Sequence, residues 1–253
     1  MRDRRRNLVL GGAGFSPSQV GASHWLLNST ESGDVTQWNS QFDSAHGTAN
    51  AARAPTGLTG AGLDFDTNDC VNLPIQASTF NTTYLGYYFW CKPDAVATSQ
   101  TLISISIGTG GASARVMVLM FSSAALICDV FVSGTAGRRA TVTSQAAAGV
   151  SRLWGFEYNN DKVGEGNKLT LTRDGAVLSP SFSDVGVGGT LGSLVSATGD
   201  ILIGNFNDGV TSNPLNGVIG RSLIAFNAPM SGATTGLLTT TARTQLLNFL
   251  PLT

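Results

Sequence analysis

Three aspartates that lie close together in the sequence are the strongest candidates for chemistry. Asp64, Asp66 and Asp69 offer carboxylate oxygens within a short segment, with the amide of Asn68 between them. Oxygen ligands of this kind are those that Ca²⁺ prefers. Aspartate and asparagine also favour turns for local reasons, because their side chains bond to nearby backbone groups. The segment therefore predicts either a calcium site or a plain turn, and a second run of this type is Asn205, Asn207 and Asp208.

The acidic residues approach the pair that a glycosidase needs only at Asp64-x-Asp66, which coincides with a strand end and which we interpret as part of a turn. A retaining glycosidase places two carboxyl groups about 5–5.5 Å apart, and alternate positions of one strand can supply them because they face the same side. None of the glutamates has an acidic residue two positions away: Glu31, Glu157 and Glu165. His24 and His46 stand apart from any Gly-x-Ser-x-Gly nucleophile motif. We therefore expect no enzymatic activity, and no cofactor apart from the calcium ion considered above.

Aromatic side chains could serve a different purpose, the binding of sugars. Tyr84, Tyr87 and Tyr88 lie together in one apolar run, and ligand sites of this kind combine aromatic faces with a few well-placed polar groups. Because side chains alternate along a strand, we expect some of the three to be buried. This run predicts a glycan as one partner.

Four arginines crowd the start of the chain. Arg2, Arg4, Arg5 and Arg6 are accompanied there by a single acidic residue, so residues 1–24 read as a basic arm that contacts an acidic neighbour. Four arginines are few for a nucleic-acid site, and we do not expect nucleic acid as a partner. A solvated tail is the alternative, and we favour a contact between subunits.

Charged residues are scarce in the chain as a whole. They make up 12% of it, about half of the roughly 25% that is typical of soluble domains. A free monomer normally keeps a mixed charged coat, so we expect copies of the chain or other proteins to cover part of this surface. No run approaches the about 18 apolar residues of a membrane span, and we expect no membrane partner. Cys70, Cys91 and Cys128 are few and widely spaced, which predicts buried, reduced thiols.

β-strands must position these residues. Short β-type runs follow one another from about residue 61, separated by clusters of Gly, Asn, Asp and Ser, and no amphipathic helix intervenes. This pattern is typical of an all-β sandwich or barrel. The runs are Tyr84–Lys92, Thr101–Ile107, Arg115–Phe121, Leu126–Val132, Arg138–Thr143, Arg152–Tyr158, Lys168–Arg173, Asp200–Gly204 and Gly217–Phe226.

Local signals at three places add detail. Asp174-Gly175 between apolar runs predicts a tight hairpin. Near the end, apolar residues recur every fourth position from Leu238 to Leu250, which predicts a helix lying across an edge or face of the sandwich. Ser231, Thr234 and Thr235 are its candidate caps. The first sixty residues suggest an irregular segment that Trp25 and Trp38, among others, pin to the sandwich.

Several motifs occur in a fixed order along the chain. Val35-x-x-Trp38-Asn39 precedes Leu63-x-Phe65-Asp66, and further segments follow at 88–94, 169–175, 201–204 and 215–226. Together they resemble the concanavalin A-like (laminin G-like) lectin and glucanase domains of phage and bacterial surface proteins. The resemblance implies a two-sheet antiparallel jelly roll over residues 25–253, with calcium at the rim in many members. The catalytic Glu-x-Asp-x-Glu run of the enzymatic members is absent from this sequence.

Two functions compete on this evidence. We expect a non-enzymatic virion protein, such as a head decoration, head fibre or tail-associated subunit of a phage, that binds the capsid shell or tail and copies of itself. The low charge and the basic arm favour this interpretation. The alternative is a bacterial extracellular or cell-surface carbohydrate-binding module that recognises cell-surface glycans, which the tyrosines favour. Fold alone does not decide between them.

Overall fold

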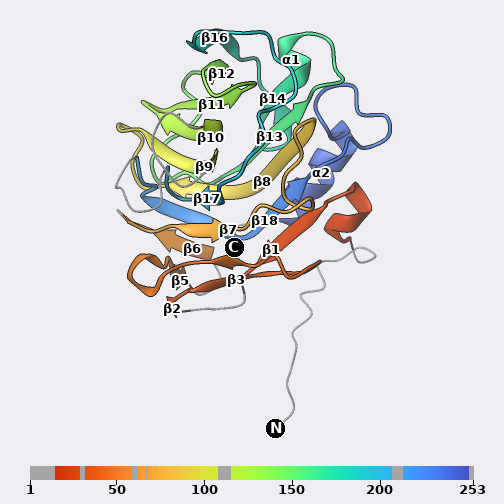
Figure 1. Ribbon diagram of the computed structural model, residues 1–253. Helices are drawn as coiled ribbons and strands as arrows, with labels where there is room; N and C mark the ends of the chain where they lie inside the picture. Colours follow the sequence, from red (N-terminus) through yellow and green to blue (C-terminus); the bar gives the residue numbers. More distant parts are fainter. Residues whose placement is uncertain are drawn as a thin grey trace.

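Short strands joined by turns build two antiparallel sheets, as the sequence predicts. Figure 1 shows the computed structural model, which describes residues 15–28, 32–58, 62–66, 68–107, 115–206 and 213–250. The helical elements are η1 (Pro17–Val20), η2 (Ala51–Arg53), α1 (Glu165–Lys168) and α2 (Thr240–Phe249). The expected class, an all-β sandwich with one C-terminal helix, is confirmed.

Sheet A has the long strand β18 near its middle. β18 (Gly217–Phe226) pairs with β8 (Tyr84–Pro93), and the sheet continues through β13 (Arg152–Asn159), β14 (Leu169–Arg173) and β15 (Ala176–Val177). The other side of β18 is shared between two short strands. One is β1 (His24–Leu27); the other is β6 (Gly62–Phe65), followed by β5 (Thr56–Leu58) and β2 (Gly33–Asp34).

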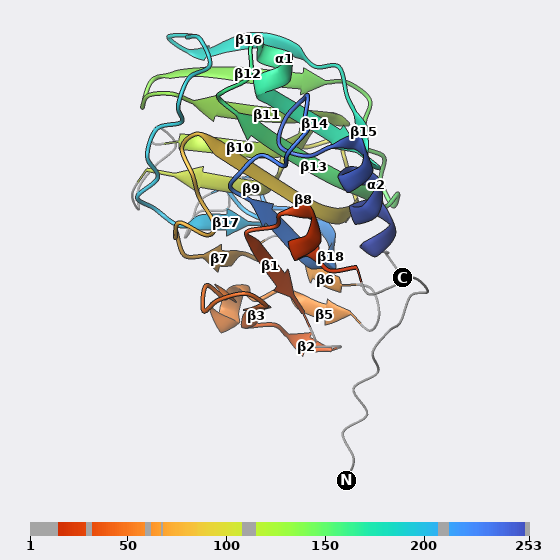
Figure 2. The same ribbon diagram turned by 90° about the vertical axis from the view of Figure 1, so that its right-hand side faces the viewer.

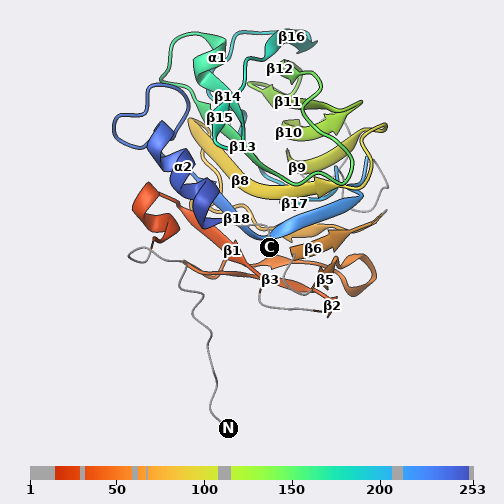
Figure 3. The same ribbon diagram turned by 180° about the vertical axis from the view of Figure 1, so that it is seen from behind.

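Sheet B runs in one unbroken order from β16 to β3. The strands are β16 (Ser181–Gly186), β12 (Ala136–Val142), β11 (Ala125–Phe131), β10 (Arg115–Ser122), β9 (Gln100–Ser106), β17 (Ile201–Ile203), β7 (Val71–Leu73), β4 (Gly47–Thr48) and β3 (Gln37–Ser40). β3 also pairs with β1 and so joins the two sheets. Seen from behind, these N-terminal strands form one end of the molecule (Figure 3).

The first sixty residues correct one expectation. Their described ranges, 15–28 and 32–58, are not an irregular segment, because β1 to β5 pair there with β18, β6 and β7. The predicted anchoring by Trp38 is confirmed: its side chain is fully buried, and its indole Nε1 donates to the carbonyl oxygen of Arg221 at 3.1 Å. Trp25 is only partly buried and packs at the edge of a second apolar cluster. Strands this short lack a clear alternation, which is why the sequence pattern did not indicate them.

The main core fills the space between the sheets. Inward residues of sheet A, such as Trp154, meet inward residues of sheet B, such as Phe121, with their ring centroids 5.0 Å apart. Burying an aromatic side chain of this size contributes roughly 1.5–3 kcal/mol. Cys70, Cys91 and Cys128 are buried, as predicted.

Helix α2 lies on the outer face of sheet A. Figure 2 shows it beside η1, in front of β8 and β18. Leu238, Ala242 and Leu246 pack there against Tyr88 and Phe226 of the sheet. The predicted helix is therefore confirmed, and it covers a face. Its cap differs from the candidates, because Thr239 is the N-cap residue and accepts a hydrogen bond from the amide of Ala242 at 3.1 Å.

A buried charged network ties α2 to sheet A. Arg243 of α2 donates from Nε and Nη2 to the carboxylate of Glu157 on β13, at 2.7 and 2.9 Å. The same carboxylate accepts hydrogen bonds from the hydroxyl of Tyr88 and from the backbone amides of Leu237 and Leu238. Glu157 is 0% and Arg243 3% exposed. So many donors offset the large cost of burying this charge.

Two glycines show how closely these elements approach. A Cβ at Gly155 on β13 would overlap the hydroxyl of Thr172 and the ring of Tyr88, so only glycine fits there. Asp174 and Gly175 adopt φ values of 52° and 80°, which is the left-handed geometry that a tight hairpin requires. The predicted turn between β14 and β15 is confirmed.

His24 is a buried titratable residue of β1. Its side chain is 0% exposed, and its Nδ1 lies 3.4 Å from Asp43 Oδ1. Burial lowers the pKa of His24, and the nearby carboxylate of Asp43 only partly offsets that effect. His46 is a further neighbour that lowers it. The ring is therefore neutral near pH 7.

No helix in the described ranges is long and apolar enough to cross a membrane.

Candidate binding face on the outer side of sheet B

One row of paired residues crosses the outer side of sheet B. Side chains alternate along a strand, and the neighbours of these residues, such as Leu119 and Ile103, point into the core. The row therefore faces away from the core. Its members, in order from β16 to β4, are Ser183, Arg139, Asp129, Val118, Ser104, Leu202, Asn72 and Thr48. We call this surface the outer face of sheet B.

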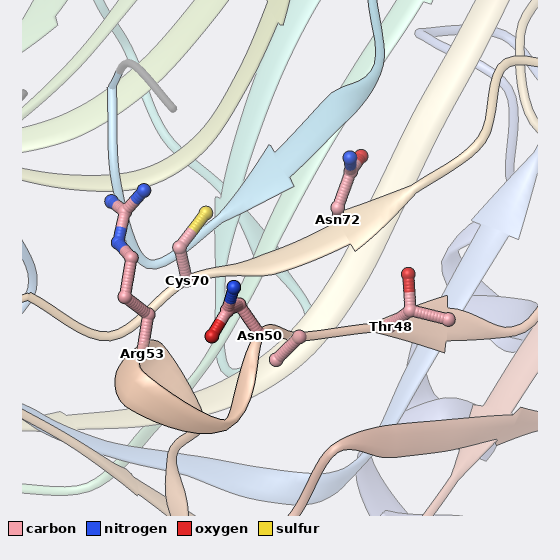
Figure 4. A pocket seen from close by; sticks show the side chains of 6 residues that line it. Thr48, Asn50, Arg53, Cys70 and Asn72 are labelled. Carbon is pink, nitrogen blue, oxygen red and sulfur yellow. The ribbon is translucent and has the colours of Figure 1, made fainter. Parts of the chain in front are cut away.

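A polar pocket lies at the β4 and β7 end of this face. It has a volume of about 290 Å³. Figure 4 shows that its side chains come from β4, η2, β7 and the turns beside them. The lining residues are Thr48, Ala49, Asn50, Arg53, Cys70 and Asn72. The lining is thus a hydroxyl, two amides and a guanidinium beside small apolar groups.

Local hydrogen bonds fix the walls of the pocket. Asn50 is the N-cap of η2, and its Oδ1 accepts from the amide of Ala52 at 3.0 Å. Arg53 ends η2 and donates from Nε to the carbonyl oxygen of Asn68 at 3.0 Å. The amide of Cys70 donates back to the carbonyl oxygen of Arg53 at 2.9 Å. The turn and the start of β7 are therefore held together before any ligand arrives.

Asn72 carries the clearest sign of a missing partner. Its Nδ2 donates to Asp200 Oδ2 at 2.6 Å. That bond sets the orientation of the amide and leaves Oδ1 buried, with no hydrogen-bond donor among the residues that the structure describes. An unpaired buried carbonyl oxygen costs about 1–3 kcal/mol. A ligand hydroxyl or amide at this point would remove that cost.

The pocket lining lacks the side chains most often used in acid–base chemistry. It contains no carboxylate and no imidazole. The nearby Asp200 is engaged by Asn72. Hydrolysis of a glycosidic bond requires a pair of carboxyl groups, and the pocket lining does not supply one.

The opposite end of the face is charged. Asp129 on β11 is 0% exposed, and Arg139 on β12 donates to both of its oxygens at 2.7 Å. Arg115 lies on β10 near this pair, with its guanidinium carbon 4.2 Å from the ring centroid of Phe206. Ser104 holds the segment of Phe206 against the sheet, because its hydroxyl hydrogen-bonds to the carbonyl oxygen of that residue at 3.2 Å.

The predicted calcium ligands do not gather into a site. The amide of Asp66 donates to Asp69 Oδ2 at 3.0 Å, which is the turn interpretation of this segment. Asp64 lies on β6, where burial and then the charges of Asp94 and Asp66 raise its pKa. Within the described ranges, no group of three or more His, Cys, Asp or Glu side chains is arranged to hold a metal ion. Calcium binding stays a prediction. In the second run Asn205 is buried, and Asn207 and Asp208 lie outside the described residues.

The predicted sugar-binding tyrosines require a correction. Tyr87 and Tyr88 are both 0% exposed, so neither can stack on a sugar. The hydroxyl of Tyr87 donates to the carbonyl oxygen of Thr79 at 2.9 Å, and that of Tyr88 belongs to the Glu157 network. Tyr84 is partly exposed and donates to Asp161. Only Tyr84 stays a candidate, and it lies on sheet A, away from the pocket.

The basic arm cannot be placed. Arg2, Arg4, Arg5 and Arg6 lie outside the described residues, and their role as a partner-binding arm stays a prediction.

Comparison with solved structures defines the class of fold: a concanavalin A-like β-sandwich. A sialidase of Trypanosoma rangeli in complex with 2,3-difluorosialic acid superposes with a TM-score of 0.63 at 13% identity, over 94% of this chain and 34% of the sialidase chain. The same sialidase with sialic acid gives a TM-score of 0.60 at 12% identity. This chain therefore spans about a third of the sialidase chains it matches.

A smaller protein matches over its full length. The CBM40 of the Ruminococcus gnavus IT-sialidase, bound to α2,3-sialyllactose, has a TM-score of 0.51 at 12% identity, over 91% of this chain and all of that one. No sequence-family model matches the chain, and no curated protein matches its sequence. The concanavalin A-like fold expected from the sequence motifs is confirmed at the level of structure.

Sequence reasoning missed the outer face of sheet B. Asn72 and Asp200 are 128 residues apart and meet only because β17 pairs with β7. Arg115 and Phe206 are 91 residues apart. The one available signal was the position of Asn72 between Val71 and Leu73, because a polar residue between two core residues of a strand faces outward.

Proposed function

We propose that this chain is a non-catalytic carbohydrate-binding module that holds a glycan on the outer face of sheet B. The observation that carries the proposal is the preformed polar pocket in which Asn72 Oδ1 is buried and unpaired. Sugar hydroxyls are donors and acceptors at once, and amide and guanidinium groups bind them in pairs. The pocket offers such groups from fixed positions, so binding loses little conformational entropy of the side chains.

Similarity of fold adds support without deciding the ligand. The structures compared above hold sialic acid derivatives or sialyllactose. At 12–13% identity they bear on the architecture alone, and the sialidase activity belongs to chains about three times as long. Absence of a carboxylate pair in the pocket supports binding over hydrolysis for this chain.

A glycan array probed with the intact chain tests the proposal. We expect binding to one or more glycans, and Asn72→Leu should weaken it about tenfold or more, because the loss of a buried hydrogen bond to Oδ1 costs about 1.4 kcal/mol or more. Thr244→Ala on α2 is the control, since this exposed hydroxyl bonds only within its helix. A chain that binds no glycan, or an Asn72→Leu variant that binds as well as the unmodified chain, would refute the proposal.

The virion role stays a second prediction. Its support is the low charge of the chain, and no structural observation adds to it. Detection of the chain in purified particles by mass spectrometry would test it.

A further inference from the structure

The charged end of the outer face carries two arginines and one aspartate among the described residues. Asp129 is the carboxylate whose charge acts on Arg115, but both of its oxygens are engaged by Arg139. Arg115 Nε is buried and has no hydrogen-bond acceptor among the described residues. Two guanidinium groups thus face one carboxylate. Burial lowers the pKa of Arg115, with Asp129 partly offsetting this effect, yet an arginine stays charged in proteins.

Arg115 is partly exposed, but its buried Nε without an acceptor is costly, and the structure keeps it in place. The ring of Phe206 lies on one side of the Arg115 guanidinium, at 4.2 Å from its carbon. Such a stack fixes the plane of the group and leaves its N–H groups to point past the ring. Arg139 is 38% exposed and is itself held by Asp129. Within the described ranges, the Nε of the fixed Arg115 guanidinium has no acceptor.

We propose that Arg115 binds the carboxylate of an acidic saccharide, with Phe206 and the Asp129–Arg139 pair positioning it. This inference rests on the proposed glycan-binding function and names the class of ligand. A planar carboxylate matches the fork of guanidinium N–H donors, and it supplies the negative charge that this end of the face lacks.

The charged site and the pocket lie on the same side of sheet B. Between them the side chains of Val118, Ser104 and Leu202 are buried, and the hydroxyl of Ser104 bonds to the carbonyl oxygens of Asn205 and Phe206. β10, which carries Arg115, and β7, which carries Asn72, are three strand spacings apart, about 14 Å. The charged site and the pocket are therefore two separate places on this side of the sheet, and the acidic saccharide binds at the charged one. Arg115 would then select for charge, and the pocket would bind hydroxyl and amide groups.

The experiment compares an acidic sugar with its neutral ester. Calorimetric titration of the intact chain with N-acetylneuraminic acid and with its methyl ester isolates the carboxylate, and glucuronic acid and glucose form a second pair that separates sialic from uronic acids. We expect at least one acid to bind about tenfold or more tightly than its neutral counterpart, because hydrogen bonds to charged groups are the strong ones. The preference should weaken with added salt.

Two variants of Arg115 and one control variant test whether this residue causes the preference for the acid. Arg115→Gln should abolish the preference for the acid, and Arg115→Lys should retain part of it, because the charge stays and the fork is lost. Arg152→Gln removes the same charge from sheet A, where Asp174 is its partner, and should leave the preference unchanged. Melting temperatures of all variants show whether they fold.

The outcomes separate the two proposals. Equal binding of acid and ester overturns the inference and leaves the glycan-binding function intact. A preference that survives in Arg115→Gln also overturns it. If neither acid binds, the inference is wrong, and the glycan array decides on its own whether the chain binds neutral glycans.

Discussion

Replacement of Arg243 by methionine should cost more stability than any exposed ion pair in the protein. The change removes the guanidinium and keeps a stem of similar length to pack in α2. Glu157 then keeps only Tyr88 and the amides of Leu237 and Leu238 as donors, at a position that is 0% exposed. Removing one partner of a buried ion pair costs about 3–5 kcal/mol.

The expected signal is large compared with the total stability. A domain of this kind unfolds with about 5–15 kcal/mol, and for a chain of this length each kcal/mol shifts the melting temperature by about 2–4 °C. Arg243→Met should therefore lower the melting temperature by roughly 6–20 °C. Differential scanning calorimetry and urea unfolding at pH 7 measure the two quantities independently.

Two further variants show whether the charge is the cause. Glu157→Gln combined with Arg243→Met leaves no buried charge and keeps an acceptor for the two amides, so it should be more stable than Arg243→Met alone. Arg152→Gln breaks a pair whose arginine is 43% exposed and should cost less than about 1 kcal/mol. The reasoning fails if Arg243→Met unfolds within about 1 kcal/mol of the unmodified chain, or if the double variant is the less stable one.

Other predictions follow from the packing and the buried groups. Gly155→Ala should destabilise the protein by about 2 kcal/mol or more, since its Cβ has no room, whereas Gly166→Ala, with no atom within 4 Å, should be close to neutral in the same urea unfolding assay. Burial lowers the pKa of His24, so this histidine is protonated at a higher pH in the unfolded chain than in the folded one. The free energy of unfolding should therefore fall as the pH drops below about 6.5. A His24→Gln variant with an unchanged pH profile would contradict this. Burial raises the pKa of the Cys128 thiol, so it should not react with a thiol reagent at pH 8 until the chain unfolds, and rapid reaction of the folded protein would show that the core is open.

The sequence predicted those features of the fold that arise from local patterns. The run from Tyr84 to Lys92 is apolar and rich in aromatic residues, which is typical of a strand, and it forms most of β8. Asp174-Gly175 specifies its hairpin because few other residue pairs adopt two consecutive positive φ values at low cost. The apolar residues at every fourth position from Leu238 to Leu250 predicted α2 in the same way.

The sequence could not predict which side chains are buried by elements that pack on a strand from elsewhere in the chain. Alternation alone predicts that one of Tyr87 and Tyr88 is exposed, but both are buried because sheet B covers one face of β8 and α2 covers the other. The candidate site depends in the same way on long-range pairing. Asn72 and Asp200 come together through β7 and β17, and their sequence neighbours contain no sign of that contact.

The central claim is that a glycan lies on the outer face of sheet B. Backbone amide NMR of the isotope-labelled chain, titrated with the strongest ligand from the array, tests this claim most directly. The account predicts that the largest shifts fall on residues of this face, among them Asn72, Ser104 and Arg115, while the amides of α2 stay unchanged. Shifts that cluster on α2 and the outer side of sheet A, with none at Asn72, would contradict it.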